Sequence, residues 1–183
     1  MSGSHGHADA HGGDKRVALL ISVLALVLAF SETLGKSAQT EALAANVEAS
    51  NVWAFFQAKT VRQTMLRTAA EQIEALATGE LARQQAAKWR DTAERYQSDR
   101  ETNEGREELA ARAKAAERKR DLSMAAYHNF ELASAAEQIA IVLASASIIT
   151  GIAALAWTAG GLGLLGAAFC VIGFWFPASV HLF

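Results

Sequence analysis

The C-terminal part of the chain carries no Asp, Glu, Lys or Arg from residue 138 to residue 183. A water-soluble domain rarely contains such a stretch, because part of every helix must then face water without a charged side chain. The stretch divides into two apolar runs, 138–157 and 162–176, with a small-residue break at 158–161 and a stop at Pro177. Aromatic residues close both ends of this pair, as in the interfacial belts of membrane proteins. We therefore predict a second and a third transmembrane helix here.

A further apolar run near the start predicts the first transmembrane helix, over residues 15–34. Its apolar part, residues 17–34, would measure about 27 Å as a helix, close to the thickness of a bilayer core. Lys15 and Arg16 stand at its beginning, where long basic side chains can reach the lipid headgroups. A cleaved signal peptide is the alternative, but no convincing cleavage site follows the run. Residues 1–14 before it are expected to be disordered.

Nearly all the charge lies in the middle of the chain, residues 35–137, which contains no Pro and is rich in Ala, Glu, Gln and Arg. These residues favour helix. A polar segment at 97–106 predicts the turn of a long extramembrane helical hairpin, a coiled-coil-like stalk. Gly79 would kink or end the first helix of this stalk. The expected fold class is therefore all-α: an integral membrane protein with three transmembrane helices and a helical stalk. A hairpin with so thin a core should associate with further copies of itself.

Composition excludes several classes of function. Lys and Arg total 17 and Asp and Glu total 19, for a net charge of -2, which argues against a nucleic-acid-binding protein. The single cysteine excludes an intramolecular disulfide and a cysteine-ligated zinc site. The chain shows no phosphate-binding loop, nucleophile elbow or His-Glu-x-x-His motif, so we expect neither an enzyme nor a bound cofactor.

The most distinctive run is Asn51-Val-Trp-Ala-Phe-Phe-Gln-Ala-Lys-Thr-Val-Arg-Gln63, which follows the first apolar segment. With the N-terminal span and the C-terminal pair of spans, it resembles the bacterial membrane-protein family catalogued as domain of unknown function 4337. The resemblance covers the chain from about Lys15 onward, although this motif is its one specific element. It implies a protein of the bacterial inner membrane and brings no substrate or catalytic residue with it.

Two interpretations of the aromatic and basic side chains in this run remain open. They could form a docking surface for another copy or a protein partner, because aromatic and Arg side chains are good interface anchors. They could instead pack against the returning helix through Tyr127 and Phe130. The candidate interface residues are Trp53, Phe55, Phe56, Gln57, Lys59 and Arg62.

Two further sets of residues suggest chemistry. The N-terminal tail holds His5, His7 and His11, whose imidazoles could bind Zn²⁺, Ni²⁺ or Cu²⁺, although a tail without a metal role is the alternative. Glu32 continues a seam of small residues on the first span, and Glu137 precedes the second span. In an oligomer these two carboxylates could form an acidic ring that selects cations, while an interfacial position without function is the alternative.

Taken together, these features predict a structural or scaffolding membrane protein that oligomerises through its stalk. A small cation channel with an acidic mouth is the alternative. The expected partners are the lipid bilayer and further copies of the chain, with any other protein partner unidentified and no nucleic acid. Basic residues before the first span favour a cytoplasmic N-terminus in a bacterial inner membrane, against a competing set of basic residues in the stalk.

Overall fold

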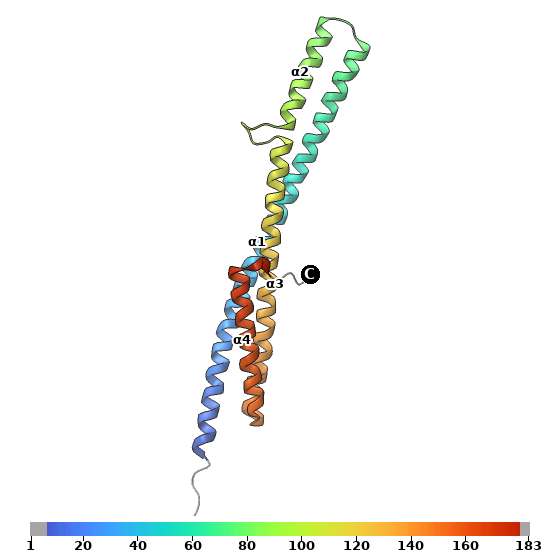
Figure 1. Cartoon of the computed structure of the whole chain (residues 1–183). Helices are drawn as coiled ribbons and strands as arrows, with labels where there is room; N and C mark the ends of the chain where they lie inside the picture. The colour runs from blue at the N-terminus through green and yellow to red at the C-terminus, as the bar shows by residue number, and fades with distance from the viewer. Residues whose placement is uncertain (1–6, 180–183) are drawn as a thin grey trace, which may run out of the picture. The chain divides into compact units, whose positions relative to one another are not determined.

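The computed structural model describes residues 7–179, and this part of the chain is entirely α-helical apart from its connections. The predicted all-α class is confirmed (Figure 1). The helices are α1 (His7–Leu76), α2 (Glu80–Gln97), α3 (Arg106–Thr150) and α4 (Ala153–Trp175), followed by the short 3-10 helix η1 (Pro177–Ser179).

Three of these helices are long and apolar enough to cross a membrane, judged by length and composition. They are α1 from Lys15 onward, α3 and α4. The most apolar segment of 18 residues in each has a mean hydropathy of 2.3, 1.7 and 1.8, respectively. The described part of the chain divides into two compact units. We call residues 7–42 with 121–179 the bundle, and residues 43–120 the arm.

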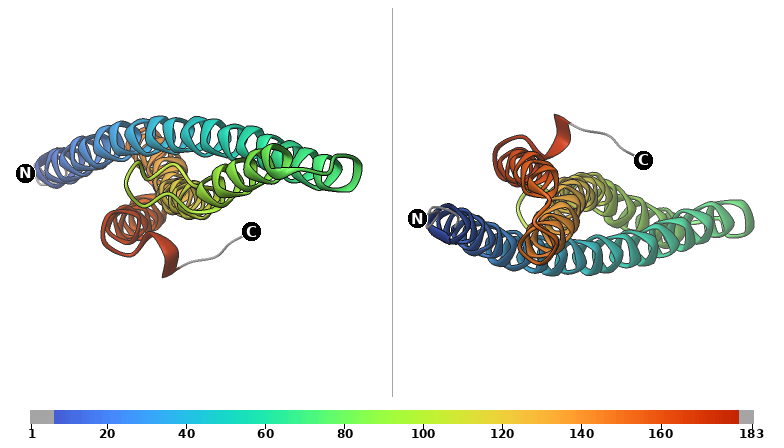
Figure 2. Two further views of the ribbon diagram at one scale, coloured as in Figure 1. Left: turned by 90° about the horizontal axis from the view of Figure 1, so that it is seen from above. Right: turned by 90° about the horizontal axis from the view of Figure 1, so that it is seen from below.

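In the bundle, the first part of α1, the second part of α3 and the whole of α4 lie side by side (Figures 1 and 2). Leu24 of α1 packs into a cluster of fully buried alanines from the other two helices, Ala140, Ala144 and Ala159. A Cβ atom on Gly35 would lie 3.4 Å from Cβ of Phe130, so α1 and α3 pack closely. Because Leu24, earlier on α1, packs with Ala140 and Ala144, later on α3, the two helices run in opposite directions. Alanine and glycine thus bring the three helices together, as in packed membrane helices.

The connection between the last two helices differs from the sequence prediction. Helix α3 continues to Thr150, and the break falls at Gly151 and Ile152 instead of at 158–161. Gly151 adopts φ 69°, a left-handed conformation that favours glycine and ends the helix. The 158–161 segment, although rich in glycine, lies inside α4, which has 23 residues and a length of about 34 Å. The predicted boundaries 138–157 and 162–176 are therefore wrong.

The first helix also starts earlier than predicted. Helix α1 begins at His7, so the expected disordered tail over 1–14 does not extend through its second half. Residues 1–6 lie outside the described part of the chain.

In the arm, the chain reverses at residues 77–79 and not at 97–106 (Figure 1). Gly79 takes φ 147°, which L-amino acids rarely adopt, and α2 then returns beside the end of α1. The loop 98–105 interrupts the returning side, and α3 continues in the same direction as α2 (Figure 1). The helix break predicted at 97–106 is present as the loop 98–105, but the reversal expected there is wrong, because a polar, helix-breaking segment can interrupt one side of a hairpin without reversing it.

The core of the arm is as thin as its composition indicates. Val52, Leu109 and Ala113 are buried together, with Trp53 and Phe56 packed against them. Farther along the arm the buried positions are mainly alanines, including Ala70, Ala86 and Ala93. Such a core holds its helices close but offers few large side chains to fix their register.

Candidate functional site

Arg106 joins the three helical segments of the arm at one point. Its Nε donates a hydrogen bond to Oγ1 of Thr60 over 2.9 Å. Its Nη1 donates to Oε1 of Gln63 over 2.6 Å and to Oε1 of Gln97 over 3.0 Å. The guanidinium carbon also lies 5.0 Å from the ring centroid of Phe56, within cation–π range. One side chain at the start of α3 therefore holds both α1 and the end of α2.

Gln63 completes this polar centre from α1. The residue is 2% exposed, and its Nε2 donates to the backbone carbonyl of Ala93 over 2.9 Å and to Oε1 of Gln97 over 3.3 Å. Its Oε1 accepts from Arg106, so both ends of the amide are bonded. A buried amide bonded at both ends allows only one register between its neighbours, which an alanine-rich core does not fix.

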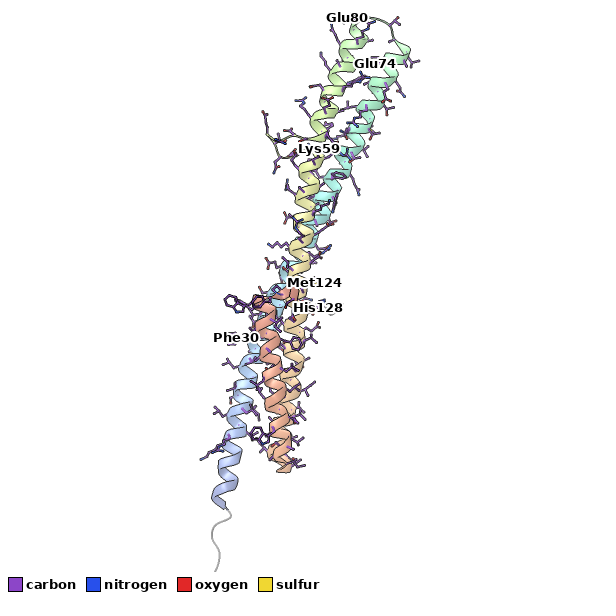
Figure 3. All side chains as sticks on the ribbon, in the orientation of Figure 1. Phe30, Lys59, Glu74, Glu80, Met124 and His128 are labelled. Carbon is purple, nitrogen blue, oxygen red and sulfur yellow. The ribbon has the colours of Figure 1, made fainter. Side chains whose placement is uncertain are left out.

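Lys59 lies in an aromatic and acidic surrounding on the same helix (Figure 3). Its Nζ is 5.2 Å from the ring centroid of Phe55, 5.4 Å from that of Tyr96 and 3.5 Å from Oε2 of Glu104. The residue is 8% exposed, so its aliphatic stem is covered while its ammonium group has a carboxylate partner. This contact connects α1 to both α2 and the loop 98–105.

Trp53 extends the centre about three turns farther along α3. Its Nε1 donates a hydrogen bond to Oε1 of Glu117 over 2.8 Å. Its ring meets that of Phe56 edge to face, with centroids 5.3 Å apart. We call Trp53, Phe56, Lys59, Gln63 and Arg106 the arm node.

The loop before α3 is held by a carboxylate at the helix start. Oγ of Ser98 donates to Oε1 of Glu108 over 2.6 Å, and the backbone N–H of Asp99 donates to Oε2 over 3.3 Å. The hydrogen bond from Ser98 is the main cause that lowers the pKa of Glu108. The pKa of Asp99 is also lowered, chiefly by the backbone N–H of Thr102. A Cβ atom on Gly105 would lie 2.6 Å from Cα of Ser98, so this position requires glycine.

The bundle contains a second polar feature of a different kind. Glu137 is completely buried on α3, and neither of its carboxyl oxygens has a hydrogen-bond partner among the described residues. It faces α4 where that helix has no side chains: a Cβ atom on Gly166 would lie 2.7 Å from Oε1. On Gly163 a Cβ atom would lie 3.6 Å from Oε2. The two glycines thus form the surface against which the carboxyl group lies.

Two other buried polar atoms in the bundle lack a partner within residues 7–179, Oγ of Ser31 and Oδ1 of Asn129. Asn129 uses its Nδ2, which donates to the carbonyls of Ala125 and Pro177 over 2.9 and 3.3 Å. It also packs closely against a glycine of α4, because a Cβ atom on Gly173 would lie 3.1 Å from Cβ of Asn129. Glycines on α4 therefore face each large polar side chain that α3 buries.

The chain matches the family described as Domain of unknown function (DUF4337), over residues 13–176. It belongs to this family. The match covers both the bundle and the arm node, and it confirms the resemblance carried by the motif at 51–63. No curated protein and no solved structure matches the sequence.

In this DUF4337 chain the candidate interface residues divide into two groups. Trp53, Phe56 and Lys59 contact other segments of the arm, whereas Phe55, Gln57 and Arg62 are exposed, with Phe55 in cation–π range of Lys59 on the same helix. The alternative of intramolecular packing thus holds for the first group. The expected contacts with Tyr127 and Phe130 are wrong, because the partners of this run on α3 are Leu109, Ala113 and Glu117.

The two candidate ion-lining carboxylates do not share a surface. Glu32 is exposed, and its Oε1 accepts a hydrogen bond from Nε2 of Gln138 over 3.4 Å. Glu137, the next residue along α3, faces the interior of the bundle. Glu32 thus lies beside Gln138 on α3, but its carboxylate is on the exposed surface while that of Glu137 faces the interior of the bundle.

The histidine prediction lies outside the described side chains, which begin at Lys15. Within the residues that the structure describes, no three His, Cys, Asp or Glu side chains are grouped as metal ligands. Arg106 and Glu117 of the arm were not predicted from the sequence, and Gln63 was named only as the last residue of the motif at 51–63. Their helical positions look like those of ordinary surface residues, and only the pairing of α3 with α1 shows otherwise.

Proposed function

We propose that this DUF4337 protein is an integral protein of the bacterial inner membrane with three spans, and that its arm assembles copies of the chain into a structural scaffold. The three long apolar helices and the family match support the membrane part of this proposal. Lys15 and Arg16 before the first span favour a cytoplasmic N-terminus, which would place the arm outside the cytoplasm.

The observation that supports assembly is an apolar stripe on the exposed side of α1 in the arm. Its members recur three, four or seven residues apart, so they lie on one face of the helix. None carries a charge, and all are exposed in the single chain. We call the following residues the arm stripe: Leu43, Val47, Ala54, Ala58, Val61 and Met65.

The spacing of the arm stripe suits a second copy of the same helix. Val47, Ala54 and Val61 are seven residues apart, and so are Ala58 and Met65, which is the repeat of a coiled coil. Asn51 falls seven residues before Ala58 in the same repeat, where a single polar residue selects one register and partner number. Several of these side chains are small, so two helices could approach closely.

Crosslinking of the full-length protein in native membranes tests this proposal. Ala58→Glu puts a charge into the arm stripe, and Ala87→Glu makes the same change at an exposed alanine of α2, outside the stripe. We expect crosslinked oligomers for the wild type and for Ala87→Glu, and their loss for Ala58→Glu. A wild-type chain that stays monomeric, or equal oligomers from both variants, would contradict assembly through the arm.

The channel alternative has no structural support of its own. It requires Glu32 and Glu137 at one mouth, and Glu137 is buried between helices of the same chain. Ion flux through liposomes containing the wild type, lost in Glu32→Gln, would revive it.

A further inference from the structure

Glu137 lies near the middle of the candidate membrane spans. Its carboxyl group packs against Gly163 and Gly166, which stand well inside the 23 residues of α4. If α4 crosses a bilayer core of about 30 Å, this level is close to the midplane. Sequence alone had put Glu137 at the membrane edge, because the break between α3 and α4 was expected later in the chain than Gly151.

The surroundings of this carboxyl group supply nothing that neutralises a negative charge. Both oxygens are buried and lack a donor within the described chain. Helix α4 carries no Asp, Glu, Lys, Arg or His, and its one ionisable side chain is the half-buried Cys170. An isolated carboxylate in an apolar medium is strongly unfavourable, so the group neutralises instead.

The titratable groups elsewhere in the bundle do not change this conclusion. On α1, Lys15, Arg16, Glu32, Lys36 and Glu41 are exposed, as is Asp121 on α3. Tyr127 of α3 is half-buried, and its hydroxyl donates a hydrogen bond to Glu131. On α3, exposed His128 and Glu131 pair with each other over 3.7 Å (Figure 3 labels His128). Buried Ser31 on α1 could donate a hydrogen bond but carries no charge.

Packing determines what could bind at this carboxyl group. A single added carbon on Gly166 would lie 2.7 Å from Oε1 and 3.1 Å from the carbonyl oxygen of Ala133, which leaves no room for a hydrated metal ion or an organic cation. A proton is the ligand that fits. Ionisation would require water or a cation to reach the oxygens, and α4 must then move away from α3.

We propose that Glu137 is a proton-binding site at the contact between α3 and α4, and that release of its proton loosens this contact. The proposal rests on the membrane spans proposed above but not on assembly through the arm. Carbonate extraction of membranes tests the membrane spans separately. The measurements below report on a single chain and do not depend on assembly through the arm. A failure of the spans or of assembly can therefore be distinguished from a failure of proton binding at Glu137.

Infrared spectroscopy of the full-length protein in liposomes tests proton binding. We expect the stretching band of a protonated carboxyl group at neutral pH, absent from Glu137→Gln and retained in Glu32→Gln, the matched exposed carboxylate. A spectrum at neutral pH that lacks any band dependent on Glu137 would overturn the proposal.

Spin labels test the coupling to the helix contact. Ile139→Cys on α3 and Leu164→Cys on α4 are both exposed, and Cys170→Ala removes the native thiol. As pH rises and the carboxyl band disappears, the distance between the labels should lengthen or broaden in the wild-type background and stay constant in Glu137→Gln. A constant distance in both backgrounds, or a carboxyl band that never disappears, would overturn the proposed loosening.

Discussion

The arm and the bundle treat buried polar groups in opposite ways. In the arm, Lys59 and Gln63 are buried, and each of their polar side-chain atoms has a partner. The partners are a carboxylate, a guanidinium, an amide and a backbone carbonyl. In the bundle, Ser31, Asn129 and Glu137 are buried with at least one polar atom unpartnered within residues 7–179. Among the described residues, the chain therefore satisfies the buried side-chain polar groups of the arm and leaves some of those in the bundle unsatisfied.

The difference follows from what holds each unit together. The arm has a thin alanine core and uses polar contacts to fix the register of its helices, so each contact must be complete. The bundle fixes its helices by close glycine and alanine packing, which does not need the polar side chains. A polar group that packing does not need, and that remains buried without a partner, is a candidate for function.

The largest effect should come from Arg106→Leu, which removes the centre of the arm node. The change leaves Gln63 and Gln97 without their strongest donor, and we expect a loss of about 3 kcal/mol in the free energy of unfolding. Chemical denaturation of the full-length protein in detergent measures it. Arg112→Leu, at an exposed position of the same helix, should change stability by less than about 0.5 kcal/mol. Equal effects of the two variants would show that the arm does not depend on its polar contacts.

An intermediate effect is expected for Gly166→Ala in the bundle. The new methyl group would meet Oε1 of Glu137 and the carbonyl of Ala133, and such overpacking costs about 1–3 kcal/mol. Gly161→Ala is the control, because a Cβ atom there has no neighbour within 4 Å among the described residues. Thermal unfolding in detergent, followed by circular dichroism, compares the two. A tolerated Gly166→Ala would mean that the contact between α3 and α4 is looser than the structure shows.

The smallest effect concerns acid sensitivity in the loop of the arm. The folded-state pKa of Glu108 lies below its ordinary value of 4.5, so its contribution to stability is present above that value and is lost as pH falls through the folded pKa. Between about pH 5 and pH 3, the wild type should lose more thermal stability than Glu108→Gln or Ser98→Ala. Glu101→Gln, at an exposed position of the same loop, should follow the wild type. Identical acid profiles for all four proteins would exclude a role for this hydrogen bond.

Much of the fold could be predicted because long helices leave a strong local signal. The helix-forming middle, the apolar runs and the family motif were all read correctly as all-α structure. The turns were not, because two glycines are ambiguous in isolation. Gly79 was expected to kink or end the first helix of the stalk, and the chain also reverses there, while Gly151 ends α3 where the sequence suggested an uninterrupted span.

The candidate sites show the same division. The motif at 51–63 was found from its composition, but Tyr127 and Phe130 were expected as its partners on α3. The observed partners are Leu109, Ala113 and Glu117. Arg106 and Glu117 gave no signal, since a charged residue on a helix is normally solvated. Their importance depends on which segments the reversal at 77–79 brings together.

The sequence by itself determined that this chain forms long helices and that three of them are apolar enough for a membrane, because both properties come from residues close together in the chain. Tertiary structure alone decided which polar side chains are buried and what they meet. Glu137 became an interior group only when α4 placed Gly163 and Gly166 against it, since burial depends on a neighbouring helix and not on the residue's own.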